Sequence, residues 1–128
     1  MTERQLQKLC QRWQKVLRLQ DWTITIRFAE RRDFRSQTSI GETNIDFNNK
    51  IARVKILNAE DMKYEYPNGT QPVAAIVIHE LVHLHVETPL DIPEHGLART
   101  ILEQGIEALA LAYYGLAEAL AMRKEGKK

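Results

Sequence analysis

The segment Ile76–His85, IVIHELVHLH, constrains the fold of this chain more than any other. It lies in a stretch that is apolar on nearly every side of a helix, which predicts a helix buried in the core. Yet seven positions of it, from His79 to His85, hold three histidines and a glutamate. Burying imidazoles and a carboxylate costs free energy unless they are paired or bind a metal. The segment therefore predicts a functional site built into a core helix.

The four polar residues of this segment do not share one face of the predicted helix. At 100° per residue, His79 and His83 lie about 40° apart, one turn from each other, so both imidazoles can bind one metal ion. Glu80 lies about 100° from His79, where it reaches a metal-bound water better than the metal itself. His85 lies about 240° round the helix, nearly opposite, and is predicted to be structural.

A third metal ligand is expected downstream, because zinc in hydrolytic sites takes three protein ligands and leaves one position for water. The residues with suitable donors are Glu87, Asp91, Glu94, His95, Glu103 and Glu107. Glu103 and Glu107 lie about 40° apart on a predicted helix, with Tyr114 on the same face. They border an apolar stripe that is expected to pack: Leu102, Ile106, Leu109, Tyr113, Leu116 and Leu120. Packing through this stripe would turn both carboxylates towards the histidines; two exposed surface carboxylates, or His95 as the ligand, are the alternatives.

The rest of the sequence predicts one α+β domain over residues 1–128, with an N-terminal helix, a small three-stranded sheet, the HELVH helix and a long C-terminal helix. The single cysteine, Cys10, is expected in the core. The predicted elements are a helix over Glu3–Leu19, a strand over Asp21–Phe28, a hairpin of Gly41–Phe47 and Lys50–Leu57 around Asn48-Asn49, a long loop over Asn58–Pro72, and helices over Pro72–Val86 and Leu97–Lys124.

Composition narrows the partners and the location that we expect. A formal net charge of +1 gives no general electrostatic case for nucleic acid or an anionic membrane. The apolar stretch Gly105–Met122 contains Glu107 and Glu118, which argues against a membrane span. The N-terminus has no apolar core of a secretory signal. We therefore expect a cytoplasmic protein.

These residues resemble the gluzincin metallopeptidases, such as the thermolysin-like enzymes. In that pattern a second helix follows the HExxH helix and carries a glutamate ligand, with another acid four positions later. Glu103 lies twenty residues after His83, at the thermolysin-type spacing, and Glu107 stands where the family has an acid that supports the first histidine. The resemblance implies that His79, His83 and Glu103 bind one Zn²⁺ and that Glu107 holds the His79 ring.

A closer likeness is to the minigluzincins and other small HExxH metallopeptidases of bacteria and phages. LQDWTITI (Leu19–Ile26), HELVH and LEQGIEALA (Leu102–Ala110) carry it, and it spans most of the chain. It implies a zincin-like fold. The chain departs from the thermolysin-like enzymes in having Leu102 where they have an asparagine, and in lacking a counterpart of the C-terminal domain that supplies their transition-state histidine.

The resulting hypothesis is a zinc-dependent endopeptidase. Glu80 would take a proton from the attacking water and pass it to the leaving amine. An extended peptide or protein substrate would pair with a sheet edge, for which we expect Ala52–Ile56. The residues considered as oxyanion donors are Tyr114, His95, Tyr64 and Tyr66.

Two other functions remain open at this stage. The chain could be a zinc-stabilised regulatory or interaction module with latent or no peptidase activity, since no second lobe is evident. It could also be a peptidase that acts on DNA-bound proteins. For that possibility the basic segment Arg31–Arg35 is the support, although Asp33 interrupts it and a solvated surface is the simpler interpretation.

Overall fold

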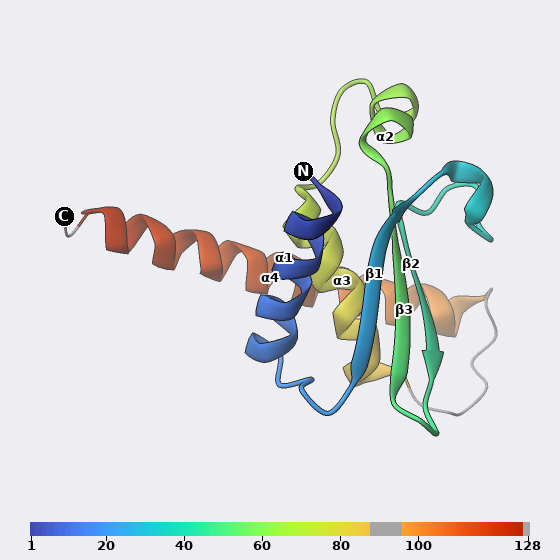
Figure 1. Ribbon diagram of the computed structural model, residues 1–128, viewed down its shortest axis with the longest axis horizontal. Helices are drawn as coiled ribbons and strands as arrows, with labels where there is room; N and C mark the ends of the chain where they lie inside the picture. Colours follow the sequence, from blue (N-terminus) through green and yellow to red (C-terminus); the bar gives the residue numbers. More distant parts are fainter. Residues whose placement is uncertain (88–95, 127–128) are drawn as a thin grey trace.

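The computed structural model describes residues 1–87 and 96–126, with side chains described as far as Arg123. Within these ranges the chain has an α+β architecture of four α-helices, one short 3₁₀ helix and a three-stranded sheet (Figure 1). The predicted N-terminal helix, small sheet and two later helices are confirmed. In chain order the elements are α1 (Glu3–Val16), β1 (Thr23–Ala29), the 3₁₀ helix (Arg31–Asp33), β2 (Gly41–Asp46), β3 (Ile51–Leu57), α2 (Ala59–Glu65), α3 (Val73–Val86) and α4 (Leu97–Gly126).

The sheet has the order β1-β3-β2. β3 pairs in parallel with β1, where Val54 lies opposite Ile26, and antiparallel with β2, where Val54 lies opposite Thr43. The prediction that Ala52–Ile56 forms an exposed edge was wrong, because β3 is the central strand. Its apolar side chains are buried, as is usual for a strand flanked on both sides. β2 is an edge strand, and it is the strand with the most extensive contact with α3.

The core lies between one face of the sheet and the helices α1 and α3 (Figure 1). α3 contacts α1, β2, β3 and α4, so the HELVH helix is the central helix of the described fold, as its sequence predicted. Cys10 is buried on the inner side of α1, as expected. The core includes Leu6, Cys10 and Trp13 of α1, Ile26 of β1, Val54 and Ile56 of β3, and Ile78 and Leu81 of α3.

The ends of the first helix and the hairpin turn differ from the prediction in detail. α1 begins with a capping box at Thr2 and ends at Val16, because Leu17 caps it and Arg18 adopts φ of 59°. The hairpin of β2 and β3 is confirmed. The left-handed residue of its turn is Lys50, with φ of 51°, and the Asn49 amide instead donates to Asp46.

The predicted long loop over Asn58–Pro72 is only partly a loop, because it contains α2. The Asn58 side chain accepts a hydrogen bond from the Asp61 N–H, and acidic residues occupy the first turn, where the helix dipole favours them. The sequence did not predict α2 because a helix of seven residues is too short to show a clear period of apolar residues. α2 carries Glu65, which pairs with Arg31 and so ties this helix to the 3₁₀ segment.

α4 packs on the rest of the fold mainly through its first half, and its later turns extend away from it (Figure 1). Ile106 and Ala110 are buried there, whereas Leu116 and Leu120, which we expected to pack, are 58% and 51% exposed. The predicted packing stripe is therefore partly wrong, because α4 extends past the end of α3. Among the described helices α4 alone is long and apolar enough to cross a membrane by length and composition, but its first half carries the acidic groups described next.

Candidate metal centre

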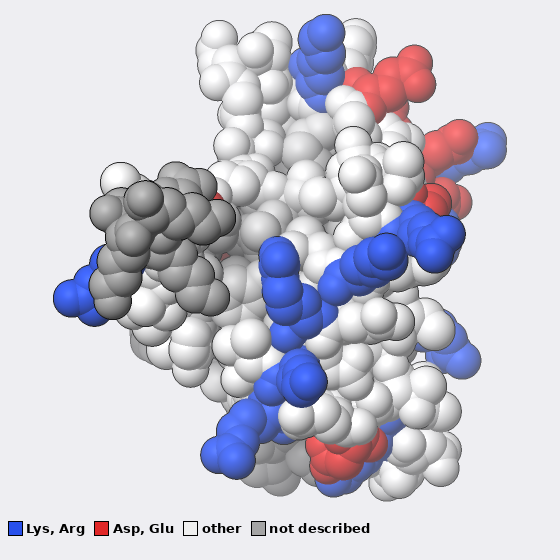
Figure 2. Space-filling model, turned by 60° about the vertical axis from the view of Figure 1, so that its left-hand side comes forward, with Lys and Arg blue, Asp and Glu red and all other residues white. Residues whose placement is uncertain are grey.

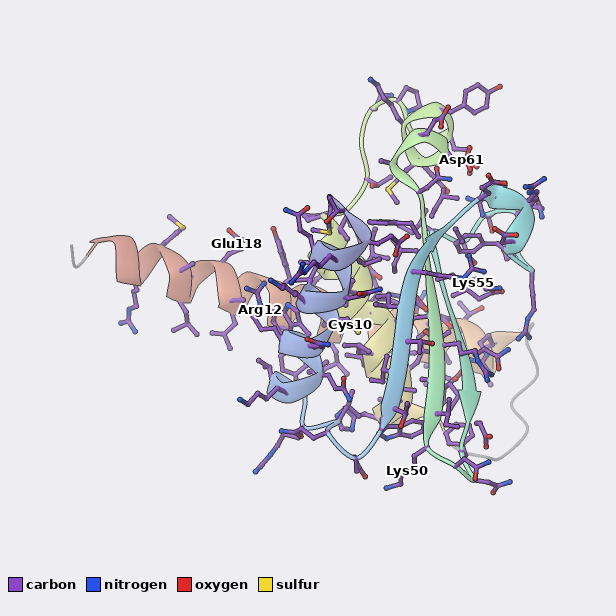
Figure 3. The ribbon with its side chains drawn as sticks, in the orientation of Figure 1. Cys10, Arg12, Lys50, Lys55, Asp61 and Glu118 are labelled. Atoms are coloured by element: carbon purple, nitrogen blue, oxygen red, sulfur yellow. The ribbon has the colours of Figure 1, made fainter. Side chains whose placement is uncertain are left out.

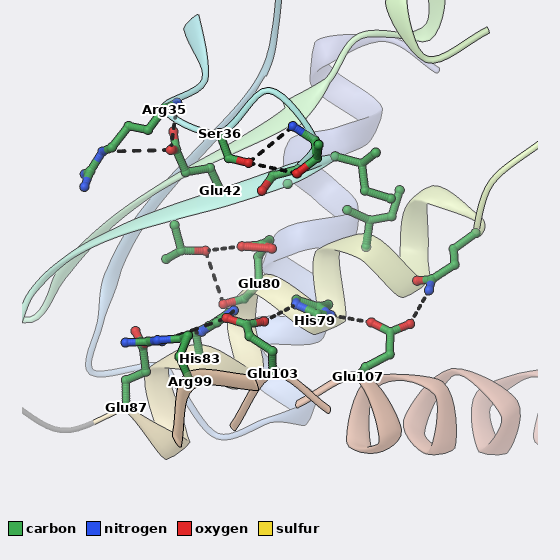
Figure 4. A pocket seen from close by; sticks show the side chains of 17 residues that line it. Arg35, Ser36, Glu42, His79, Glu80, His83, Glu87, Arg99, Glu103 and Glu107 are labelled. Carbon is green, nitrogen blue, oxygen red and sulfur yellow. Dashed lines mark hydrogen bonds and ion pairs between the residues drawn. The ribbon is translucent and has the colours of Figure 1, made fainter. Parts of the chain in front are cut away.

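Three predicted ligand residues meet between α3 and α4 (Figure 4). His79 Nε2 lies 3.3 Å from Glu103 Oε2, and His83 Nε2 lies 3.6 Å from Glu103 Oε1. One donor atom from each of the three residues lies within 4.8 Å of the others. Both imidazoles thus present the same nitrogen to one carboxylate, which is the convergence that a shared cation requires.

The separations of these atoms fit a small tetrahedral ion. With ligand bonds of about 2.05 Å and tetrahedral angles, neighbouring donor atoms on zinc lie about 3.3 Å apart. The two histidine–Glu103 distances are 3.3 and 3.6 Å. The donor set of two imidazoles and one carboxylate is one that zinc takes in hydrolytic sites. The residues present therefore match zinc in their donor types, and the two histidine–Glu103 distances, each to a different carboxylate oxygen, are close to those of a tetrahedral site.

The outer nitrogen of His79 has its own partner. His79 Nδ1 lies 2.6 Å from Glu107 Oε2, and the amide of Gln71 donates to the other Glu107 oxygen. Because a carboxylate only accepts, the Nδ1 atom donates its proton to Glu107. The ring is thereby held with Nε2 turned towards Glu103. Gln71 lies just before α3, so the entry to this helix and the middle of α4 fix the ring together.

His83 also has a carboxylate near its outer nitrogen, although at a longer distance. His83 Nδ1 lies 3.6 Å from Glu87 Oε1, and the Arg99 guanidinium donates to that carboxylate. Arg99 Nη1 also lies 3.9 Å from Glu103 Oε1. Along α3 and its C-cap the groups His79, His83 and Glu87 are spaced by four residues, and along α4 so are Arg99, Glu103 and Glu107. The two rows face each other in opposite chain order, with Glu107 at His79 and Arg99 at Glu87.

Glu80 enters the site from the flank of α3 and is held by β2. Its side chain is 4% exposed, and Thr43 Oγ1 donates to Glu80 Oε1 over 2.9 Å. A Cβ atom placed on Gly41 would lie 2.9 Å from Glu80 Oε2, closer than real side chains approach. Only a glycine at position 41 leaves this carboxylate its observed place. The edge strand β2 therefore positions Glu80 through the hydrogen bond from Thr43 and through the space that Gly41 leaves.

A cavity of about 780 Å³ opens over these groups. The Glu103 side chain is 41% exposed, so the metal-binding end of the cluster is accessible from it. The walls of the cavity are β2 and the segment before it on one side, and α3 and α4 on the other (Figure 4). The lining includes Arg35, Ser36, Thr38, Gly41, Thr43, Gln71, His79, Glu80, His83, Glu87, Arg99, Glu103 and Glu107.

The electrostatics of the cluster favour positive charge, which protons on the imidazoles or a bound cation can supply. Burial alone lowers the pKa of His79, but the hydrogen bonds to Glu103 and Glu107 and the charge of Glu80 outweigh it and raise this pKa to about 9. The hydrogen bond from His79 holds the pKa of Glu103 below its usual range, although burial opposes this. Burial raises the pKa of Glu80, with the histidines offsetting part of the effect. Several carboxylates thus surround the two imidazoles, and a divalent cation would relieve the repulsion between these carboxylates.

Several other residues considered from the sequence are not at this site. Tyr114 is partly buried against the core and does not line the cavity. Tyr64 is exposed and Tyr66 donates to the Thr38 carbonyl, so neither faces the cluster. His85 donates to the Leu17 carbonyl, as its predicted structural role requires. The candidates Asp91, Glu94 and His95 lie outside the described residues.

Four contributors to the site were missed in the sequence: Gly41, Thr43, Gln71 and Arg99. Glu87 was considered as a third ligand and instead supports His83. Its position four residues after His83 is a signal for this role, because i and i+4 side chains meet on a helix. Arg99 precedes Glu103 by four residues in the same way. The contribution of β2 depends on tertiary packing and leaves no local sequence signal.

Comparison with protein-family models, with curated proteins and with solved structures gives no match to this chain. The functional argument therefore depends on the residues and their geometry.

Proposed function

We propose that this chain is a zinc-dependent endopeptidase with a zincin-like active site. The observation that carries the proposal is the convergence of His79 Nε2, His83 Nε2 and the Glu103 carboxylate, each histidine backed by a second carboxylate. Carboxylate–histidine pairs of this kind set the tautomer and orientation of zinc ligands. The resemblance to minigluzincins, which the HELVH and LEQGIEALA segments carry, supports the same function.

Bound zinc would lower the pKa of a water molecule and polarise a peptide carbonyl. The chain supplies the proton transfer. Glu80 would accept the proton of the attacking water and donate it to the leaving amine. Thr43 occupies Glu80 Oε1, so the other oxygen, Oε2, is the one we assign to the proton. Glu107 and Glu87 do not touch the substrate in this scheme; they hold the two rings.

The substrate peptide would lie extended along β2. This strand is an edge of the sheet, it borders the cavity, and it already contacts Glu80 through Thr43. A peptide that pairs with the backbone of an edge strand gains main-chain hydrogen bonds, whatever its sequence. Its scissile carbonyl would then lie over the histidines. This assignment replaces Ala52–Ile56, which is excluded as an edge by its central place.

A developing oxyanion needs a donor besides the metal. Arg99 is our candidate, because its guanidinium lines the cavity and lies 3.9 Å from Glu103 Oε1. It also supports Glu87, so its replacement would affect both roles. Arg99→Lys keeps the charge and loses the fixed fork of donors, and we expect a lower kcat with zinc content retained.

Metal analysis combined with two variants tests the proposal. Purified wild-type protein should hold one zinc per chain, and Glu103→Ala should lose most of it. Glu80→Gln should keep the zinc and lose cleavage of a denatured protein substrate, because the amide cannot accept a proton. A wild-type protein that binds no zinc would refute the metal centre. Zinc binding with no cleavage of any peptide library would refute the peptidase but leave the metal centre.

The second candidate is a zinc-stabilised interaction module with latent or no peptidase activity. The observation that favours it is the second half of α4, where Leu116, Leu120 and Met122 are exposed on a helix that extends beyond the core. Exposed apolar patches of this kind often mark interaction surfaces. In that case Glu80→Gln would change neither zinc content nor any measured function, whereas removal of zinc would lower thermal stability.

A further inference from the structure

The solvent side of α1 carries a row of cations. Arg4, Lys8, Arg12 and Lys15 are all exposed and, at 100° per residue, fall within an arc of about 80°. We name this group the basic stripe. Arg12 points away from the sheet (Figure 3), and Figure 2 shows a band of Lys and Arg across this side of the molecule, with acidic side chains at its margins.

The basic stripe has no acidic partner within the described part of the chain. None of its four side chains forms an ion pair or a hydrogen bond with a carboxylate there. Glu3, the acid in the first turn of α1, is engaged by the backbone N–H of Phe28. Like charges one turn apart repel each other by a few tenths of a kcal/mol per pair. An unpaired row of this kind therefore favours an anionic partner.

Other described cations are either paired with an acid or, like Arg18, Arg53, Lys63 and Arg123, exposed singly on different elements without forming a row. The basic segment Arg31–Arg35, considered from the sequence, is neutralised: Arg31 pairs with Glu65, and Arg32 with Glu30. Lys50 pairs with Asp21 on the hairpin turn. Within the described residues α1 thus carries a continuous row of four unpaired cations, which the net charge of +1 does not reveal.

We propose that the basic stripe binds the phosphate backbone of double-stranded DNA. Successive members are separated by about 4.5–6 Å along the helix axis, and the row from Arg4 to Lys15 spans about 16 Å. Duplex DNA offers one negative charge per about 1.7 Å of its axis, so several phosphates lie within reach. The inner side of α1 is packed on the core, so α1 lies across the backbone and reads no bases.

Two other anionic partners fit α1 less well. Single-stranded nucleic acid needs exposed aromatic rings on which bases stack, and Trp13, the aromatic residue of α1, is buried. A helix that lies on a membrane inserts its apolar face into the lipid, and the apolar face of α1 is already in the protein core. Phosphates of a duplex require only the charges that the stripe presents.

Fluorescence anisotropy of a labelled mixed-sequence DNA duplex tests this proposal at a series of salt concentrations. Four phosphate contacts predict a slope of about −3.6 in log K against log salt. The double variant Lys8→Gln/Arg12→Gln should reduce the slope by about 1.8 and, by the same relation, weaken binding about 60-fold at about 0.1 M salt. The matched control Arg32→Gln/Lys50→Gln changes the net charge equally and should bind as wild type does.

Each result of this experiment either supports or overturns the proposal that the basic stripe binds DNA. Absence of duplex binding by wild type at about 50 mM salt would overturn the proposal, as would equal losses in the two double variants. Binding to vesicles containing phosphatidylserine without binding to DNA would assign the stripe to lipid and also overturn it. Circular dichroism melts of all variants establish that they fold. Glu80→Gln should bind DNA as tightly as wild type, so this test is independent of the proposed peptidase activity.

Discussion

Replacement of Gly41 by alanine tests how tightly β2 packs against the buried Glu80 carboxylate. The new Cβ would lie 2.9 Å from Glu80 Oε2 and 3.0 Å from both Cδ and Cγ. Ordinary contacts begin at 3.4 Å, so the carboxylate would have to retreat by about 0.5 Å. Because Glu80 is buried on a core helix and bonded to Thr43, it has little room to do so.

The expected cost follows from two opposing contributions. Overpacking of a buried site costs about 1–3 kcal/mol. Alanine also restricts the unfolded chain, which returns about 0.4–1 kcal/mol. We expect Gly41→Ala to lower the free energy of unfolding by about 1–2 kcal/mol, or Tm by about 4–8 °C in a chain of this size. If the peptidase proposal is correct, zinc stays bound and the rate falls by about 10²-fold, because the base is misplaced.

Gly105→Ala is the matched control. Position 105 is in the interior of α4, and nothing lies within 4 Å of a Cβ built there. Alanine is the better helix former by about 0.8–1 kcal/mol, so this variant should be more stable than wild type. The two glycine-to-alanine changes thus have opposite expected signs. Thermal unfolding followed by circular dichroism measures both.

A double-mutant cycle isolates the contact itself. In a Glu80→Ala background the atoms that crowd the new Cβ are absent, so Gly41→Ala should cost little there. The same loss in both backgrounds would show that the effect does not come from Glu80. A Gly41→Ala protein as stable as wild type would refute the argument directly.

Three further outcomes can be checked with simple assays. Glu107→Gln should weaken zinc binding about 10–100-fold in competition with a chromophoric chelator, because His79 loses its charged partner; an unchanged affinity would contradict this role. Arg31 holds the pKa of Glu65 below its ordinary value of 4.5, so the stabilisation by this pair is complete above that pH and is lost as the pH falls through the lower folded value. Glu65→Gln should therefore be less stable than wild type at neutral pH and approach it in acid, and a gap in Tm that is constant with pH would exclude the mechanism. Burial raises the pKa of the Cys10 thiol to about 11, so iodoacetamide at about pH 8 should modify it only after unfolding, as mass spectrometry of native and denatured samples would show.

The sequence predicts the structure best for features that depend only on the residues of a single helix or strand. HELVH predicts a buried helix with two imidazoles on one side, because helical period and apolar context are local properties. The same holds for the α4 carboxylates, which the 3.6-residue period places on one face. The α+β class follows from these local patterns in sequence. In each of these cases the structure agrees with the pattern.

Failures occur where the outcome depends on which elements meet. The central place of β3 is a property of strand order, and its own sequence is equally compatible with an edge. Leu116 and Leu120 continue the apolar stripe of α4, but they lie beyond the end of α3 and are exposed. The sequence of α4 alone does not show how far a neighbouring helix will extend along it. Gly41 and Thr43 reach Glu80 only because β2 packs against α3. α2 was missed because seven residues are too few to establish a helical period.

The facing rows on α3 and α4 also fix how the two helices are aligned along their length. In the observed alignment Glu107 meets His79, Glu103 lies between the two imidazoles, and Arg99 meets Glu87. If α4 slid by one turn towards its own N-terminus, Glu103 would move against Glu87, and two negative charges would be opposed. A slide the other way would bring the Arg99 guanidinium towards the His83 ring and leave Glu87 without its cation. The groups of the candidate metal centre thus also favour the alignment of the two helices in which each charged group meets a group of opposite charge or an imidazole.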